Sequence, residues 1–158
     1  MRVTERAPMY HFFVRRRLRI ILARLNAGDF AFVTRQFHRK ASHSFSGKHA
    51  LSGTRTTPER IAEWYRRLAA VFPGIRFDVR RLFVAGPPWN TQAAIQWVDE
   101  VRDREGRPLP NEGVFFIRLR WGKATDLHVY CDTALIEKNL AILASQGVSE
   151  ASAAPIVG

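Results

Sequence analysis

The stretch Gly113–Thr133, GVFFIRLRWGKATDLHVYCDT, decides the fold. Apolar residues alternate along both of its halves: Phe115, Ile117, Leu119 and Trp121, then Leu127, Val129 and Cys131. A period of two is typical of strands with one buried face. Gly122-Lys123 predicts the turn between the halves, because glycine accepts a positive φ without a Cβ clash. The stretch therefore predicts a long β-hairpin. Such a hairpin needs further strands and helical cover, since it is not stable alone in water.

Helical patterns precede and follow this hairpin. Apolar residues among arginines predict an amphipathic helix over 9–25, and Asp29 is a cap for a short second helix. Thr57-Pro58-Glu59 starts a third helix, whose apolar positions Ile61, Trp64, Tyr65, Leu68 and Phe72 form one buried face. A closing helix is predicted over 134–145, after the capping residues Asp132 and Thr133.

The remaining segments alternate as strands. They are a short strand that begins near His38 and gives way to a glycine-rich loop, then strands over 75–84 and 93–101. The order of elements predicts an α+β fold, in which helices cover the concave face of a curved antiparallel sheet. With no repeat and no linker, residues 1–158 form a single predicted domain with a core over about 14–143 and loosely ordered termini.

The net charge of +11 is concentrated in the first half of the chain. Residues 1–81 hold 18 basic and 5 acidic residues, whereas 82–158 hold 7 and 9. The arginines at 15, 16, 19, 24, 66, 67, 80 and 81 would suit a patch for nucleic acid or anionic lipid. No nucleic-acid-binding motif accompanies them, so a solvated basic surface is the favoured interpretation and a nucleic-acid partner is not expected.

Several classes of protein are not expected from this sequence. No apolar run reaches the roughly 18 residues of a membrane span, and arginines interrupt any signal-peptide core. The single Cys131 excludes an internal disulfide and suits a reducing compartment, so a cytoplasmic location is predicted. No His, Asp or Glu set has metal-ligand spacing and no glycine motif cradles a phosphate, so neither a metal nor a cofactor is expected.

Several motifs together resemble the NTF2-like superfamily, specifically its SnoaL-like and ketosteroid-isomerase-like branch. They are the helix–Leu25-Asn26-Ala27-Gly28-Asp29–helix opening, the loop from Phe45-Ser46-Gly47 to Leu51-Ser52-Gly53, the turn Gly86-Pro87-Pro88-Trp89, and Trp121-Gly122-Lys123 with Tyr130-Cys131-Asp132-Thr133. The resemblance covers about 14–143 and implies a cone-shaped α+β roll. It does not decide the function, because this fold hosts isomerases, cyclases, dehydratases and proteins without chemistry.

The catalytic residues of the family do not carry over to this sequence. The isomerase base would fall near Ser44, its tyrosine near Ile21, its partner acid near Phe115, and the cyclase acid near Val129. The resemblance does imply an orientation, in which Phe115, Ile117, Leu119, Leu127, Val129 and Cys131 line the cone. The opposite face would then present Phe116, His128 and Tyr130, and a homodimer through this outer face is predicted.

Two residues are candidates for acid–base catalysis. Asp99 shares strand parity with Ile95 and Trp97, so it would be a carboxylate directed at an apolar cone, with a raised pKa suited to proton transfer. The alternative is a strand-end aspartate in solvent or paired with an arginine. His49, expected near the pocket mouth, could move protons, or could be a loop histidine bonded to backbone, and His43 has the same ambiguity.

The predicted ligand-binding residues are aromatic and aliphatic: Tyr65, Trp97, Phe115, Ile117, Leu119 and Val129. Tyr65 and Trp97 could stack on a flat ligand or serve only as core. Two functions stay open. One is a cyclase, isomerase or dehydratase acting on a hydrophobic polyketide- or steroid-like molecule. The other is a non-catalytic module that binds a small apolar ligand or a partner chain.

Overall fold

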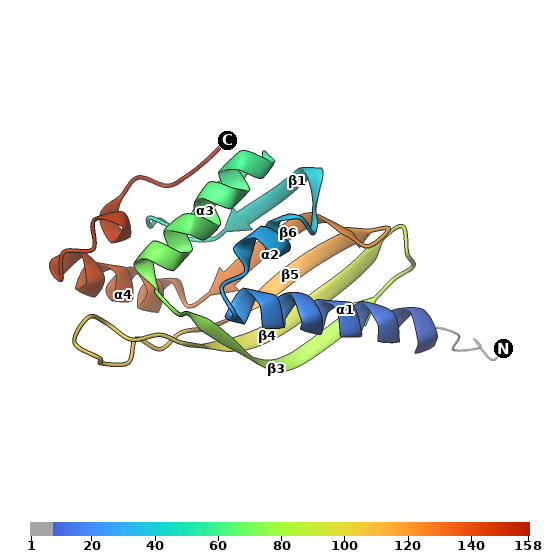
Figure 1. The fold of residues 1–158 in the computed structure, drawn as a ribbon, viewed down its shortest axis with the longest axis horizontal. Coiled ribbons are helices and arrows are strands. Elements are labelled where there is room, and N and C mark those ends of the chain that lie inside the picture. The colour runs from blue at the N-terminus through green and yellow to red at the C-terminus, as the bar shows by residue number, and fades with distance from the viewer. Residues whose placement is uncertain (1–7) are drawn as a thin grey trace.

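A computed structural model describes residues 8–158 as helices packed on one mixed sheet (Figure 1). The helices are α1 (Pro8–Asn26), α2 (Phe30–Thr34), α3 (Pro58–Val71) and α4 (Thr133–Ser145), with a short 3-10 helix, η1 (Ser149–Ser152). The strands are β1 (Phe37–Phe45), β2 (Gly53–Arg55), β3 (Arg76–Ala85), β4 (Thr91–Glu100), β5 (Glu112–Arg120) and β6 (Lys123–Cys131). The predicted α+β class is confirmed, whereas the three-residue strand β2 and the short 3-10 helix η1 were not predicted.

The six strands lie in the order β2-β1-β6-β5-β4-β3. All neighbours pair antiparallel except β1 and β6, which run parallel, so the expectation of an entirely antiparallel sheet is wrong for this one pair. Between β1 and β6 the chain forms α3 and four strands, and so long a connection leaves either direction open. Figure 1 shows α1, α2 and α3 on the same face of the sheet, which leaves the other face of the central strands uncovered by these helices.

The predicted hairpin forms the centre of the sheet as β5 and β6. Its turn differs by one residue from the expected one, because Arg120 pairs with Lys123 and the two turn residues are Trp121 and Gly122. Both have positive φ, 49° and 78°. This conformation matches the twist of a two-residue hairpin but is strained for a residue as bulky as tryptophan. The turn projects Trp121 into solvent.

The predicted caps hold the ends of three helices. Asp29 accepts from the Phe32 amide at 3.0 Å, Thr57 from Arg60 at 3.3 Å, and Asp132 from Leu135 at 3.0 Å. Each side chain satisfies an amide that the first helical turn leaves free. The last cap places α4 directly after β6, at the end of the sheet opposite the Trp121 turn.

The C-terminal segment is packed, in contrast to the loosely ordered end expected from the sequence. Ala151 and Ile156 are buried, and the backbone of Gly158 exchanges hydrogen bonds with Thr54 and Thr56 beside β2. The sequence did not predict this packing, because the segment consists mainly of small residues and has too few apolar positions to give a periodic pattern. The loose N-terminal start expected from the sequence lies in residues 1–7, outside the described part of the chain. Within residues 8–158 no helix is long and apolar enough to cross a bilayer.

Candidate functional site

A cavity lies between the inner face of the sheet and helices α1, α2 and α3. Twenty residues line it, nearly all of them apolar. The cavity volume is about 70 Å³, whereas one water molecule needs roughly 10–15 Å³. Half-buried Ile21, Gln36 and Gly122 belong to its lining, so the cavity comes nearest to solvent between α1 and the Trp121 turn.

Most of the predicted ligand-binding residues line this central cavity. They are Tyr65, Phe115, Ile117, Leu119 and Val129. Trp97 does not line it. Its ring packs edge-on against Phe77 at 5.0 Å and lies 5.2 Å from Phe115, between centroids, and it faces a smaller neighbouring cavity. The strand parity of the hairpin therefore predicted which side chains face inward, while contact with a ligand stays a prediction.

Asp99 lines the smaller cavity rather than the central one. One carboxylate oxygen accepts from the Asn111 amide at 2.9 Å, and no ion pair involving Asp99 occurs within residues 8–158. Burial raises the pKa of Asp99 to about 7, and the Asn111 hydrogen bond opposes this rise only in part. The carboxyl group is thus inward and near its midpoint at neutral pH, as the sequence suggested.

An aromatic wall separates Asp99 from the central cavity. The two cavities share five lining residues, Trp64, Leu68, Phe77, Phe115 and Val129. Cys131 and Asn111 also line the smaller cavity. Burial raises the pKa of the Cys131 thiol to about 12, so this thiol is protonated at neutral pH. A ligand in the central cavity reaches Asp99 only if side chains of the shared wall move.

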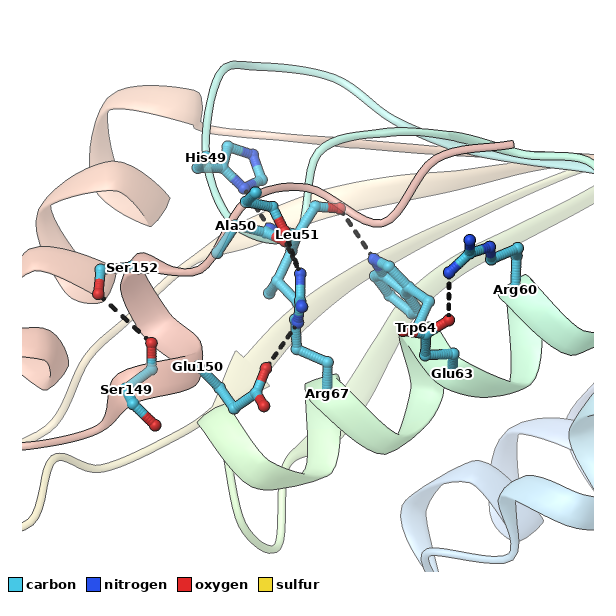
Figure 2. Close-up of polar contacts among 11 residues, drawn as sticks. His49, Ala50, Leu51, Arg60, Glu63, Trp64, Arg67, Ser149, Glu150 and Ser152 are labelled. Carbon is cyan, nitrogen blue, oxygen red and sulfur yellow. Dashed lines mark hydrogen bonds and ion pairs between the residues drawn. The ribbon is translucent and has the colours of Figure 1, made fainter.

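His49 lies away from the cavity, so its expected place at the mouth is wrong. Its Nε2 donates to the Ser46 carbonyl at 2.9 Å and its Nδ1 accepts from the Leu51 amide at 3.3 Å. Figure 2 shows its loop lying beside α3, where Trp64 Nε1 donates to the Leu51 carbonyl at 2.8 Å. The ring borders an open groove beside α4 and the C-terminal segment. Both nitrogens are therefore used by backbone, which is the alternative that the sequence left open.

A buried histidine, His43 on β1, does line the central cavity. It is fully buried, its Nδ1 lies 2.9 Å from Arg55 Nη2, and its Nε2 has no hydrogen-bond partner in the described part of the chain. A guanidinium only donates hydrogen bonds, so Nδ1 is the acceptor and the ring carries its proton on Nε2. Burial, aided by the Arg55 charge, lowers the pKa of His43 well below its usual range and keeps the ring neutral.

Tyr65 lies beside His43 in the same corner. The two rings meet edge-on with centroids 5.6 Å apart, and no hydrogen bond to the Tyr65 hydroxyl occurs within residues 8–158. Burial raises the pKa of this phenol above its usual value, so the hydroxyl keeps its proton at neutral pH. The corner thus holds two neutral groups able to donate to an acceptor oxygen. The sequence named Tyr65 and left His43 undecided; the alternation of Ala41, His43 and Phe45 along β1 was the signal that His43 faces inward.

The uncovered face of the sheet carries the residues of the predicted dimer surface. Phe116 and Tyr130 are exposed, and the rings of Tyr130 and His128 stack at 4.0 Å between centroids. The His128 Nε2 lies 2.7 Å from the Ser46 hydroxyl. These side chains lie on the predicted face, while dimer formation itself stays a prediction. In the part of the chain that the structure describes, no group of three or more His, Cys, Asp or Glu residues is placed to hold a metal.

Comparison with known proteins identifies the family. The model of the SnoaL-like domain matches residues 18–127, well over half of the chain. The chain belongs to the SnoaL-like family. The region matched to this SnoaL-like model extends from α1 into β6 and includes His43, Tyr65, Asp99 and Phe115. A search of curated proteins found no match to this SnoaL-like chain.

Solved structures confirm the NTF2-like fold of this SnoaL-like chain. TerC co-crystallised with polyporic acid is 20% identical, with 79% of this chain and 95% of that chain covered and a TM-score of 0.68. An NTF2-like protein of unknown function from Burkholderia pseudomallei is 14% identical, with 82% and 96% covered and a TM-score of 0.68. PrhC from Penicillium brasilianum is 11% identical, with 87% and 95% covered and a TM-score of 0.70. At these identities the likeness shows the fold alone.

Proposed function

We propose that this SnoaL-like protein binds one small, mostly hydrophobic molecule in the central cavity and acts on it by acid–base chemistry, as a cyclase, isomerase or dehydratase of polyketide- or steroid-like substrates. One observation carries the proposal. Two neighbouring hydrogen-bond donors, His43 and Tyr65, line a cavity whose wall is otherwise mostly apolar. Such a site buries an apolar body and orients it by its oxygen. The crystallisation of TerC with polyporic acid supports a small organic ligand.

The chemistry that suits these groups is proton transfer next to a carbonyl. His43 Nε2–H and the Tyr65 hydroxyl would donate to the carbonyl oxygen, which gains negative charge when a neighbouring C–H bond breaks. Asp99 would take that proton and return it to a different carbon, so that an isomerisation needs no other reactant. Its pKa of about 7 suits this exchange, provided that Phe77 or Phe115 moves aside.

The second candidate function is a non-catalytic binding module of the same fold. The aromatic wall between Asp99 and the central cavity favours it, because an acid–base group has to reach the reacting atoms. Once a ligand is known, Asp99→Asn separates the two functions. An enzyme loses about 10²-fold or more in turnover with its affinity kept, whereas a binding module keeps its affinity and has no turnover to lose.

Native mass spectrometry of the purified protein tests the proposal. We expect an added mass of one small organic molecule on the wild-type protein. Ala124→Phe should lose this mass, because Ala124 is a buried cavity-lining residue and the added ring would fill the space. Ala94→Phe, on the opposite face of the sheet beside Phe116, is the matched control and should retain the mass. Equal retention by both variants would place the ligand elsewhere and refute the proposal.

We also propose a homodimer through the uncovered sheet face and a cytoplasmic location. The dimer is supported by the exposed Phe116 and Tyr130 on the adjacent strands β5 and β6, where Phe116 pairs with His128, two residues before Tyr130. The location rests on the lone Cys131.

A further inference from the structure

A buried positive charge stands behind the polar corner of the cavity. Arg55, on the short strand β2, is 0% exposed and is the largest fully buried side chain of the described residues. It makes no ion pair with any residue of 8–158. Burying a guanidinium without an opposite charge is unfavourable, and buried charges in proteins are usually paired. Such a charge needs a structural or a functional explanation.

The contacts of Arg55 solvate its charge without neutralising it. Nη1 donates to the Ser52 carbonyl at 2.9 Å and lies 3.4 Å and 3.3 Å from the carbonyls of Leu51 and Ile156. Its guanidinium carbon lies 5.3 Å from the centre of the Trp64 ring, and its Nε has no partner among the described residues. Burial lowers the pKa of Arg55 to about 10, so the side chain remains a cation at neutral pH.

His43 connects the Arg55 charge to the cavity through a hydrogen bond. Arg55 Nη2 donates to Nδ1, which leaves Nε2–H as a buried donor without a partner among the described residues, in a ring that lines the cavity. The titratable groups near the pair are Tyr65 from α3, His49 from the β1–β2 loop and His128 from β6. Burial raises the pKa of Tyr65 and lowers those of both histidines, so all three are neutral at neutral pH. Arg55 therefore provides the uncompensated charge of this corner.

We infer that the His43–Arg55 pair makes the cavity selective for an apolar ring that carries an acidic hydroxyl and binds as its oxyanion. The inference rests on the proposed function, because it presumes that the cavity is the ligand site. The oxyanion accepts from His43 Nε2–H, with the Tyr65 hydroxyl as a second donor, and its charge balances that of Arg55. His43 is the contacting residue, and Arg55 is a positioning residue that acts through it.

The direction in which the pKa of a phenol changes on binding tests this inference. The probe is 4-nitrophenol, whose ionisation is visible in its absorbance, and its neutral analogue is 4-nitroanisole. An apolar cavity without a charge raises the pKa of a bound phenol, whereas a nearby cation lowers it. We expect the wild-type protein to lower the pKa of bound 4-nitrophenol by one unit or more. It should correspondingly bind the phenolate at least about tenfold more tightly than the neutral phenol, and should prefer the phenolate to 4-nitroanisole.

Variants assign the effect to the pair. Arg55→Met should raise the pKa of the bound phenol above that of the free probe and abolish the preference over 4-nitroanisole. His43→Phe keeps a ring in the wall and removes the donor, so it should weaken the preference. Arg67→Met is the matched control, because Arg67 is also mostly buried nearby but pairs with Glu150 at 2.8 Å and does not line the cavity (Figure 2). It should behave as wild type.

The outcomes separate this inference from the proposed function. If both probes bind and the wild-type protein raises the pKa of the phenol, the inference is wrong and cavity binding stands. If neither probe binds, the proposed function fails and the inference fails with it. The wild-type measurement alone shows whether the pKa of the bound phenol rises or falls, even if Arg55→Met does not fold.

Discussion

Replacing Asp99 by asparagine should change how the stability of the protein depends on pH. Asp99 is half-buried, and its pKa is raised from 3.8 to about 7 chiefly by burial. The folded state therefore holds the proton more tightly than the unfolded state. Its contribution to stability is fully present below pH 3.8 and is lost as the pH rises towards 7, because the unfolded carboxyl ionises first.

The size of this loss follows from the pKa values. One pKa unit corresponds to about 1.4 kcal/mol, so the rise from 3.8 to about 7 amounts to about 4 kcal/mol as an upper value. Asp99→Asn removes the titration and keeps an oxygen for the Asn111 amide, which donates to Asp99 at 2.9 Å. We therefore expect the free energy of unfolding of the variant to increase by a few kcal/mol relative to that of wild type between pH 4 and pH 8, so that the variant becomes the more stable of the two.

Urea denaturation at pH values from 4 to 8 measures this difference. The control is Asp78→Asn, since Asp78 is an exposed carboxylate on the neighbouring strand β3 that pairs with Arg80 at 3.0 Å. The control should follow the wild-type curve more closely than Asp99→Asn does. Parallel pH profiles for wild type and Asp99→Asn would mean that the carboxyl is not buried as described, and would refute its role as a poised proton carrier.

Three further predictions concern the surface and the sheet. Analytical ultracentrifugation at micromolar concentration should find a dimer that Tyr130→Arg dissociates, because the new charges would face each other across the interface; a wild-type monomer contradicts this. Binding to nucleic acid should be weak, independent of sequence and lost near physiological salt. Tight binding that survives at this salt and disappears when Arg15, Arg16 and Arg19 are replaced would overturn the cavity account. Gly113→Ala should destabilise the protein by more than about 2 kcal/mol in urea denaturation, because the added Cβ would clash with the Tyr130 carbonyl oxygen and the Trp97 ring. A loss of stability below about 0.5 kcal/mol would contradict this and would show that β5 shifts easily.

The fold was predictable because its signals are local. Alternation along β5 and β6 identified the inward side chains, and Asp29, Thr57 and Asp132 marked three helix starts. The parallel pairing of β1 with β6 was not predictable in this way, since no short turn connects the two strands. The packed C-terminal segment depends on contacts with β2, a strand too short to give a pattern.

The site was predictable only in its apolar part. Tyr65 and Phe115 line the cavity because helix and strand periods place them there. Arg55 reads as a surface residue in the sequence, since arginine is rarely fully buried, and only its contacts reveal a charge beneath the cavity. His49 and His43 could not be ranked from sequence, because the path of the intervening loop decides which imidazole faces the cavity.

A crystal structure of the protein with 4-nitrophenol tests the central claim most directly. The account predicts the ring within the cavity between α1, α3 and the sheet. Its phenolate oxygen should lie within about 3.2 Å of His43 Nε2. A ring seated outside this cavity, or one whose oxygen points away from His43, would contradict the account.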